Sequence, residues 1–111
     1  MDTQTNHDLP IACDLAAINA DLRSTHIESA KQLLNEGAQE VQELPDGFAL
    51  RYAAEQYAQV TQFIANERLC CPFFTFVLEV TPASGPIWLR ITGRDGVKDF
   101  LRAELDFGAG S

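Results

Sequence analysis

Two adjacent cysteines, with a glutamate before them and a proline after them, form the most chemically reactive segment of this chain, Glu67-Arg68-Leu69-Cys70-Cys71-Pro72. Glu67 and Cys71 are four residues apart, so on a helix their side chains would lie on one face, a turn apart. Two ligands at this spacing can reach one metal ion, as the two histidines of a metalloprotease helix do. Thiolates suit Zn, Cu(I) or Hg. The segment therefore predicts a soft-metal site, with the candidate ligands Cys70, Cys71, Glu67 and Cys13.

Two other interpretations of the same residues remain open. Cysteine is among the most buried residue types, so Cys70 and Cys71 can be small core side chains. Glu67 would then pair with Arg68, Arg51 or a backbone donor, because a buried charge needs a partner. The third interpretation is a redox or nucleophilic thiol, which is disfavoured because the C-terminal end of a helix raises the pKa of a thiol. Under the metal hypothesis, Arg68 is the ion-pair partner that holds Glu67 charged.

The two histidines do not extend the candidate site. His26 lies on the apolar stripe of a predicted helix, where a hydrogen-bonded core histidine is more common than a ligand, and His7 lies in the polar amino-terminal segment. Neither can be placed beside Cys71 from the sequence, so a Cys-His nucleophile pair is unsupported. No Ser-His-Asp set, paired-carboxylate pattern or nucleotide loop is visible, which makes an enzyme the least supported class.

Composition narrows the function further. The chain has 111 residues, enough for one domain with its own core, and a net charge of −8 with scattered basic residues, which argues against nucleic-acid binding. Residues 1–10 lack the basic and apolar regions of a signal peptide, and no apolar run is long enough for a membrane span. We therefore expect a cytoplasmic protein. Its three cysteines are expected to stay reduced, and an odd count with two adjacent cysteines is a poor disulfide framework.

Hydrophobic periodicity divides the chain into eight elements. Alternation predicts strands, a helical stripe predicts helices, and Gly37, Pro72 and a Pro-Asp-Gly turn at 45–47 mark boundaries. For the first helix we favour a start at Asn19 over one at Thr25. The expected elements are a strand over 11–16, a helix over 19–37, strands over 41–44 and 48–52, a helix over 55–71, strands over 74–80 and 87–92, and a helix over 97–105.

This order, β-α-β-β-α-β-β-α, predicts an α+β fold with a mainly antiparallel five-stranded sheet and helices on one face. Cys13 would point inward from the first strand. The domain would span residues 10–107, with flexible ends at 1–9 and 108–111. The uncovered face of the sheet would carry Val77 and Trp88 beside a Glu79–Arg90 pair, which makes a homodimer contact plausible there.

The segment Glu67-Arg68-Leu69-Cys70-Cys71-Pro72-Phe73-Phe74-Thr75-Phe76, followed by Ile87-Trp88-Leu89-Arg90-Ile91-Thr92-Gly93, resembles a group of small uncharacterised bacterial proteins. Their signature is E-R-x-C-C-P-F-x-x-F with a following L-x-I-T strand. The resemblance covers about residues 11–105 and is specific around the Cys-Cys-Pro-Phe segment. Members of the group are often found near heavy-metal resistance or metal-regulator genes. The resemblance implies a metal-related role and supplies no reaction.

These observations favour a small cytoplasmic protein that binds a soft metal ion or senses a thiol-reactive species through Cys70 and Cys71. Glu67 would be a nearby hard ligand or proton acceptor, and Cys13 a third sulfur. The alternative is a non-enzymatic homodimeric interaction or small-ligand-binding module in which both cysteines are structural.

Overall fold

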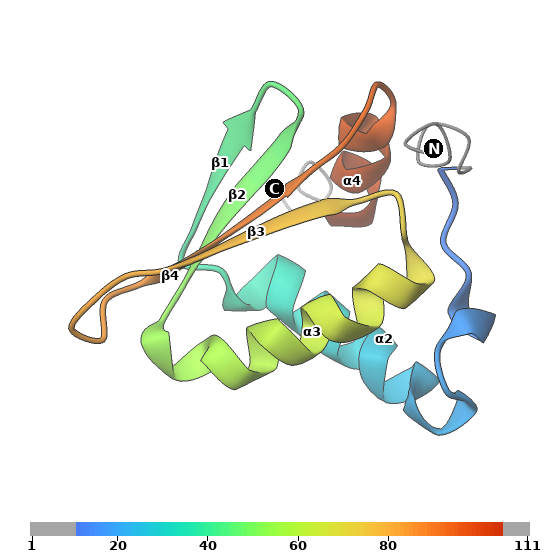
Figure 1. Cartoon of the computed structure of the whole chain (residues 1–111), viewed down its shortest axis with the longest axis horizontal. Helices are drawn as coiled ribbons and strands as arrows, with labels where there is room; N and C mark the ends of the chain where they lie inside the picture. Colours follow the sequence, from blue (N-terminus) through green and yellow to red (C-terminus); the bar gives the residue numbers. More distant parts are fainter. Residues whose placement is uncertain (1–10, 106–111) are drawn as a thin grey trace, which may run out of the picture.

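The structure is a computed structural model, and it describes residues 11–105. The ends predicted to be flexible, 1–9 and 108–111, lie outside the described residues, as does His7. The described part is an α+β fold with helices packed under a twisted antiparallel sheet (Figure 1). Its helices are α2 (Arg23–Gln32), α3 (Tyr57–Cys70) and α4 (Val97–Leu105), and its strands are β1 (Glu40–Leu44), β2 (Gly47–Tyr52), β3 (Thr75–Val80) and β4 (Ile87–Thr92).

The sheet has four strands in the order β1-β2-β4-β3, so the prediction of five strands is wrong. Every neighbouring pair is antiparallel, and β4 lies between β2 and β3. The two hairpins that the turn signals predicted are both present, with β1 paired to β2 and β3 paired to β4. Apart from the missing first strand, the order of elements agrees with the sequence.

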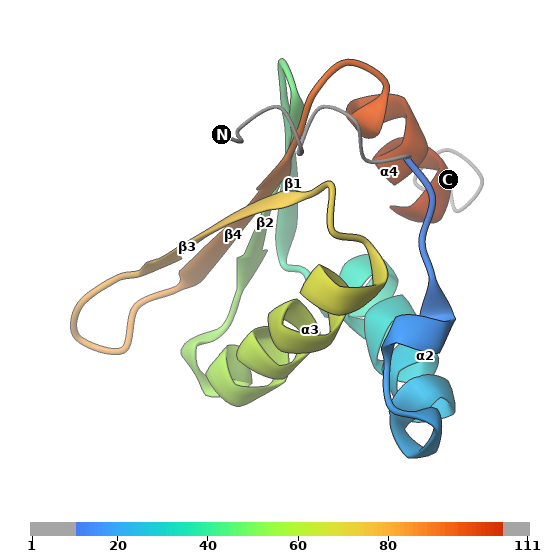
Figure 2. The same ribbon diagram turned by 45° about the vertical axis from the view of Figure 1, so that its right-hand side comes forward.

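Residues 11–18, predicted as the start of the sheet, follow a different path. In Figure 2 this segment, drawn in blue, runs from beside α4 to the start of α2 and stays away from the sheet. The Asp14 carboxylate accepts a hydrogen bond from the Ala16 N–H at 3.0 Å and begins a 3-10 turn over Leu15–Ala17. Such local bonds from a short acidic side chain compete with strand pairing. Consequently Cys13 is exposed, and the inward-facing position predicted for it is wrong.

The first helix begins where the sequence indicated. The Asn19 side chain accepts from the Asp21 N–H at 3.0 Å, and a 3-10 turn over Ala20–Leu22 leads directly into α2. The helix ends in a π-helical turn over Leu33–Gly37. The buried hydroxyl of Tyr52 donates to the Leu33 carbonyl at 2.9 Å, which fixes this turn against β2, and burial raises the pKa of Tyr52.

One face of the sheet carries the core. Alternate residues of β2 and β4 face the helices and are buried, and the core cluster also takes residues from the α2 end, α3 and α4: Leu33, Leu34, Phe48, Leu50, Tyr52, Val60, Phe63, Ile87, Leu89, Ile91 and Leu101. All three helices therefore cover the same face. In both views α2 and α3 lie side by side beneath the sheet (Figures 1 and 2).

Charged side chains attach α4 to the first hairpin. Glu43 accepts from Lys98 at 2.6 Å and from Arg102 at 3.1 Å, and both cations lie over the ring of Phe48. Hydrogen bonds from Lys98 and Arg102 hold the pKa of Glu43 below its usual value. The contact joins β1, at one edge of the sheet, to the last helix.

The opposite face of the sheet is only partly polar. The predicted Glu79–Arg90 pair forms at 3.0 Å, and Val77 is about half exposed at 47%. The homodimer contact at Val77 and Trp88 stays a prediction, because the structure describes one chain. Within residues 11–105, no helix is long and apolar enough to cross a membrane.

Candidate functional site: a cysteine cluster beside a histidine–carboxylate pair

The end of α3 places two cysteines in the interior. Cys70 is the last helical residue and Cys71 is the C-cap, whose N–H still donates to the Glu67 carbonyl at 2.7 Å. Pro72 follows and cannot continue the helix. Cys70 and Cys71 are 3% and 1% exposed, and they pack with Ile18 and Phe73 in a small second core. The helical turn therefore supplies one sulfur and the residue after it supplies another.

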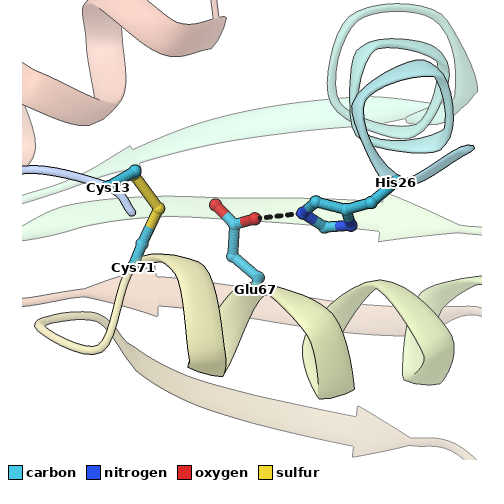
Figure 3. Close-up of a disulfide and its surroundings, with 4 residues drawn as sticks. All are labelled: Cys13, His26, Glu67 and Cys71. Carbon is cyan, nitrogen blue, oxygen red and sulfur yellow. Dashed lines mark hydrogen bonds and ion pairs between the residues drawn. A yellow bond between two sulfur atoms is a disulfide. The ribbon is translucent and has the colours of Figure 1, made fainter. Parts of the chain in front are cut away.

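Cys13 and Cys71 form a disulfide, which corrects the expectation that all three cysteines stay reduced (Figure 3). Their Cα atoms are 4.5 Å apart, and they are 58 positions apart in the sequence. A backbone hydrogen bond runs alongside it, because the Asp14 N–H donates to the Cys70 carbonyl at 2.7 Å. The amino-terminal segment is thus attached to the end of α3 by a covalent bond and by a backbone bond.

Cys70 lies outside the disulfide and adds a third sulfur to the site. The three Sγ atoms of Cys13, Cys70 and Cys71 all lie within 4.8 Å of one another. The sequence predicted these three cysteines as candidate ligands, and the structure brings all of them together. Three sulfurs at this separation allow thiol–disulfide exchange within the cluster, and they allow metal coordination after reduction.

Glu67 lies next to this cluster and is bonded to a histidine. Its Oε1 is 2.8 Å from His26 Nε2, across the interface between α3 and α2. Figure 3 shows the Glu67 carboxylate between the disulfide and the imidazole ring. The side chains of His26 and Glu67 are 4% and 13% exposed. His26 is therefore a hydrogen-bond partner of Glu67 that the sequence analysis did not name, and Arg68, which it did name, lies exposed beside Glu67 in the chain.

The imidazole of His26 is held in place by its surroundings. Its ring stacks on Phe63, with the ring centroids 6.0 Å apart and the planes 21° from parallel. Within the described part of the chain, its buried Nδ1 has no hydrogen-bond partner, since only Nε2 meets Glu67. The expectation of a core histidine agrees with this burial, and its link to the candidate site was missed.

The cysteines and the His26–Glu67 pair line one cleft of about 720 Å³. The cleft lies between α2, the amino-terminal segment and the end of α3, with β4 and α4 contributing Ile91 and Leu101 to its wall. Ligand sites in proteins commonly have this size, with mostly apolar walls and a few polar groups. The remaining lining residues are Leu15, Ile27, Ala30, Lys31, Leu34, Asn35, Glu36, Phe63 and Phe74.

One signal in the sequence could have identified His26 as the hydrogen-bond partner of Glu67. Both Glu67 and His26 fall on apolar stripes of predicted helices, and a buried charged or polar side chain has to be hydrogen-bonded. Two buried polar side chains on consecutive helices are therefore expected to be hydrogen-bonded to each other. The cysteine pairing had no comparable signal, because the path of residues 11–18 depends on contacts with the end of α3.

No family model, curated protein or solved structure matches this chain. The residues and geometry of the cleft are therefore the basis for assigning a function.

Proposed function

We propose that this protein binds a soft metal ion through the thiolates of Cys13, Cys70 and Cys71 when the disulfide is reduced. The observation that supports the proposal is the separation of the three Sγ atoms, all within 4.8 Å of one another. Metal–sulfur bonds of about 2.3 Å place the sulfurs of a three-coordinate site about 4.0 Å apart. After reduction the Cys13 and Cys71 sulfurs have to move apart from bonding distance to reach this separation, and rotation of their side chains provides that movement.

Reduction converts the cluster from a closed state to a binding state. A dithiol reductant supplies two electrons to the Cys13–Cys71 bond, the reductant becomes a disulfide, and two protein thiols form. The three thiols then lose their protons as the metal binds, so affinity falls at low pH. A reducing compartment such as the cytoplasm keeps the site in its thiol form.

The neighbouring groups suit Zn, Cu(I) and Hg to different degrees. Cu(I) and Hg are satisfied by sulfur alone, whereas Zn takes a fourth ligand. Glu67 faces the same cleft and is the hard ligand or proton acceptor in this proposal. Its bond to His26 supports the role, because a metal-binding or proton-accepting carboxylate is commonly oriented by a hydrogen bond.

Titration of the reduced protein with Hg(II), Cu(I) and Zn tests the proposal. We expect the reduced wild type to bind one ion per chain tightly and the Cys13→Ser and Cys70→Ser variants to bind it more weakly. The oxidised protein should not bind it. Ala12→Ser is the matched control, because it adds the same hydroxyl at an exposed position beside Cys13. Equal affinities of wild type and a Cys70→Ser/Cys71→Ser double variant would refute the proposal.

A second candidate is a non-enzymatic module in which the cysteines are structural. It is favoured by the disulfide and by the near-complete burial of Cys71. In this case Cys70→Ala leaves metal affinity unchanged, and the half-exposed Val77 on the open sheet face contributes to a homodimer. The solution mass measured by light scattering distinguishes a dimer from a monomer, and Val77→Glu would dissociate the dimer.

A further inference from the structure

The cleft beside the cysteines is much larger than the cluster at its end requires. Its volume is about 720 Å³, whereas a metal ion held by three sulfurs occupies only the space between them. Most of the wall beyond the sulfurs is apolar. The apolar lining residues that keep accessible surface include Ile27, Ala30 and Phe74, whereas Phe63 and Ile91 are buried in the main core cluster. A ligand that fills the cleft therefore has an apolar part in addition to a sulfur-binding centre.

The rim of the cleft is also apolar and open to solvent. Leu15, in the amino-terminal segment, and Ile27, on α2, both line the cleft and are 39% and 38% exposed although both are large hydrophobic residues. Exposed apolar side chains around a concave site are typical of ligand grooves. Ile27 is on α2, one residue after His26, so the apolar rim lies close to the His26–Glu67 pair.

The charges of the cleft favour a cation. Glu67 and Glu36 line it together with the three cysteines, and the basic side chains among the described lining residues are Lys31 and His26. Reduced cysteines add further negative charge when a soft ion displaces their protons. A ligand that binds here thus combines a soft, positively charged centre with an apolar substituent.

On this basis, and resting on the proposed function, we propose that the ligand is a soft metal cation carrying one apolar organic group. The metal is bound by thiolate from the Cys13, Cys70 and Cys71 cluster, and the organic group lies against the apolar wall. The cation arrives bound to a small thiol. A protein thiol forms a new metal–sulfur bond, the metal–sulfur bond to the small thiol breaks, and the proton of the protein thiol passes to the released small thiol. The metal–carbon bond is unchanged.

Phenylmercury and methylmercury are the probes that test this inference, each supplied as its complex with the same small thiol. Both cations have one positive charge, so the comparison isolates the contribution of the organic group. If the ring buries about 60 Å² more apolar surface than a methyl group, phenylmercury binds about tenfold more tightly to the reduced protein. Competition with the small thiol gives the two affinities.

Two matched variants locate the organic group. Ile27→Gln replaces an apolar rim residue, and we expect it to reduce the preference for phenylmercury at least about threefold. Leu22→Gln is the control, because Leu22 is 44% exposed in the turn that leads into α2 and does not line the cleft; it lines a neighbouring groove between α2 and α3. We expect this control to leave the preference for phenylmercury over methylmercury unchanged. Both positions are exposed, so both variants are expected to fold.

The outcomes separate this inference from the proposed function. Tight binding of Hg(II) with no preference for phenylmercury, or equal effects of the two glutamine variants, would overturn the organic-group inference and leave metal binding intact. Loss of all mercury binding would overturn the proposed function. A phenyl preference that Ile27→Gln reduces and Leu22→Gln does not would support the inference.

Discussion

Reduction of the Cys13–Cys71 bond should greatly lower the stability of the domain. The bond closes a loop spanning 58 residues in sequence, and a cross-link of that span restricts the unfolded chain by about 4 kcal/mol in the chain-entropy model. Domains of this size have unfolding free energies of about 5–15 kcal/mol. The disulfide therefore contributes a large fraction of the total, and the reduced protein should remain folded with a small margin.

Urea denaturation of the oxidised and reduced forms measures this effect. With a urea dependence of about 2 kcal/mol per molar, the loss of 4 kcal/mol lowers the midpoint by about 2 M. Cys13→Ala should have a low midpoint with or without reductant, because it cannot form the bond. Cys70→Ala keeps the bond and loses the third thiol, so it should show the full response to reductant.

Equal midpoints for the two forms, with the redox state of each confirmed by mass spectrometry, would refute the reasoning. Amide exchange identifies a more limited failure. If reduction releases only residues 11–18, protection falls in that segment alone and the midpoint for the rest of the domain is unchanged. The stabilisation would then belong to the amino-terminal segment and would not extend to the whole domain.

Three further predictions concern the fold. Tyr52→Phe leaves the Leu33 carbonyl without its buried donor and should cost about 1–2 kcal/mol of unfolding free energy, measured by urea denaturation; an unchanged value would mean that the bond contributes nothing net. Gly47→Ala should cost more than 3 kcal/mol or prevent folding, because its Cβ would overlap the Ile91 carbonyl oxygen in the neighbouring strand, and a thermal midpoint equal to wild type would contradict this close approach. The lowered pKa of Glu43 means that its bonds to the two α4 cations stabilise the fold above the usual glutamate pKa, and that this stabilisation is lost as pH falls through the lowered value. The stability difference between wild type and Glu43→Gln should therefore shrink on acidification, and a difference independent of pH would argue against an ionic contribution.

Local sequence signals were sufficient where an element is defined by its own residues. The Pro-Asp-Gly turn at 45–47 and the alternation of Phe48, Leu50 and Tyr52 predicted the first hairpin, because one face of these strands is buried and the turn fixes their register. Pro72 marked the end of α3 for a similarly local reason. Each of these signals lies within a few residues of the feature that it predicts.

The same alternation failed over residues 11–16. Cys13 and Leu15 fit a strand pattern, yet both are exposed, and the buried residue of the segment is Ile18. The Asp14 carboxylate bonds to the Ala16 N–H in a local turn instead, and the sheet that covers the core has four strands. A short alternating run is weak evidence for a strand when an acidic side chain within it can bond to its own backbone.

The sequence predicted only some residues of the candidate site, because the residues that form it are distant from one another in the chain. Glu67, Cys70 and Cys71 are neighbours on α3, and their spacing indicated a shared site. Cys13 and His26 reach them from the amino-terminal segment and from α2, through contacts that no local pattern encodes. Periodicity identifies which face of a helix is buried, but it does not identify the residue on the facing element.

The arrangement around Cys13 bears on how the site changes between redox states. The Asp14 N–H bond to the Cys70 carbonyl and the burial of Ile18 against the second core do not require the sulfur–sulfur bond. We expect both interactions to hold the segment beside the end of α3 after reduction, which would keep Cys13 close to the other two sulfurs. Under the proposed function, binding energy would then not be consumed in bringing a mobile segment to the metal. A cluster positioned by these contacts can alternate between a closed disulfide and an open set of thiols with little movement of the backbone.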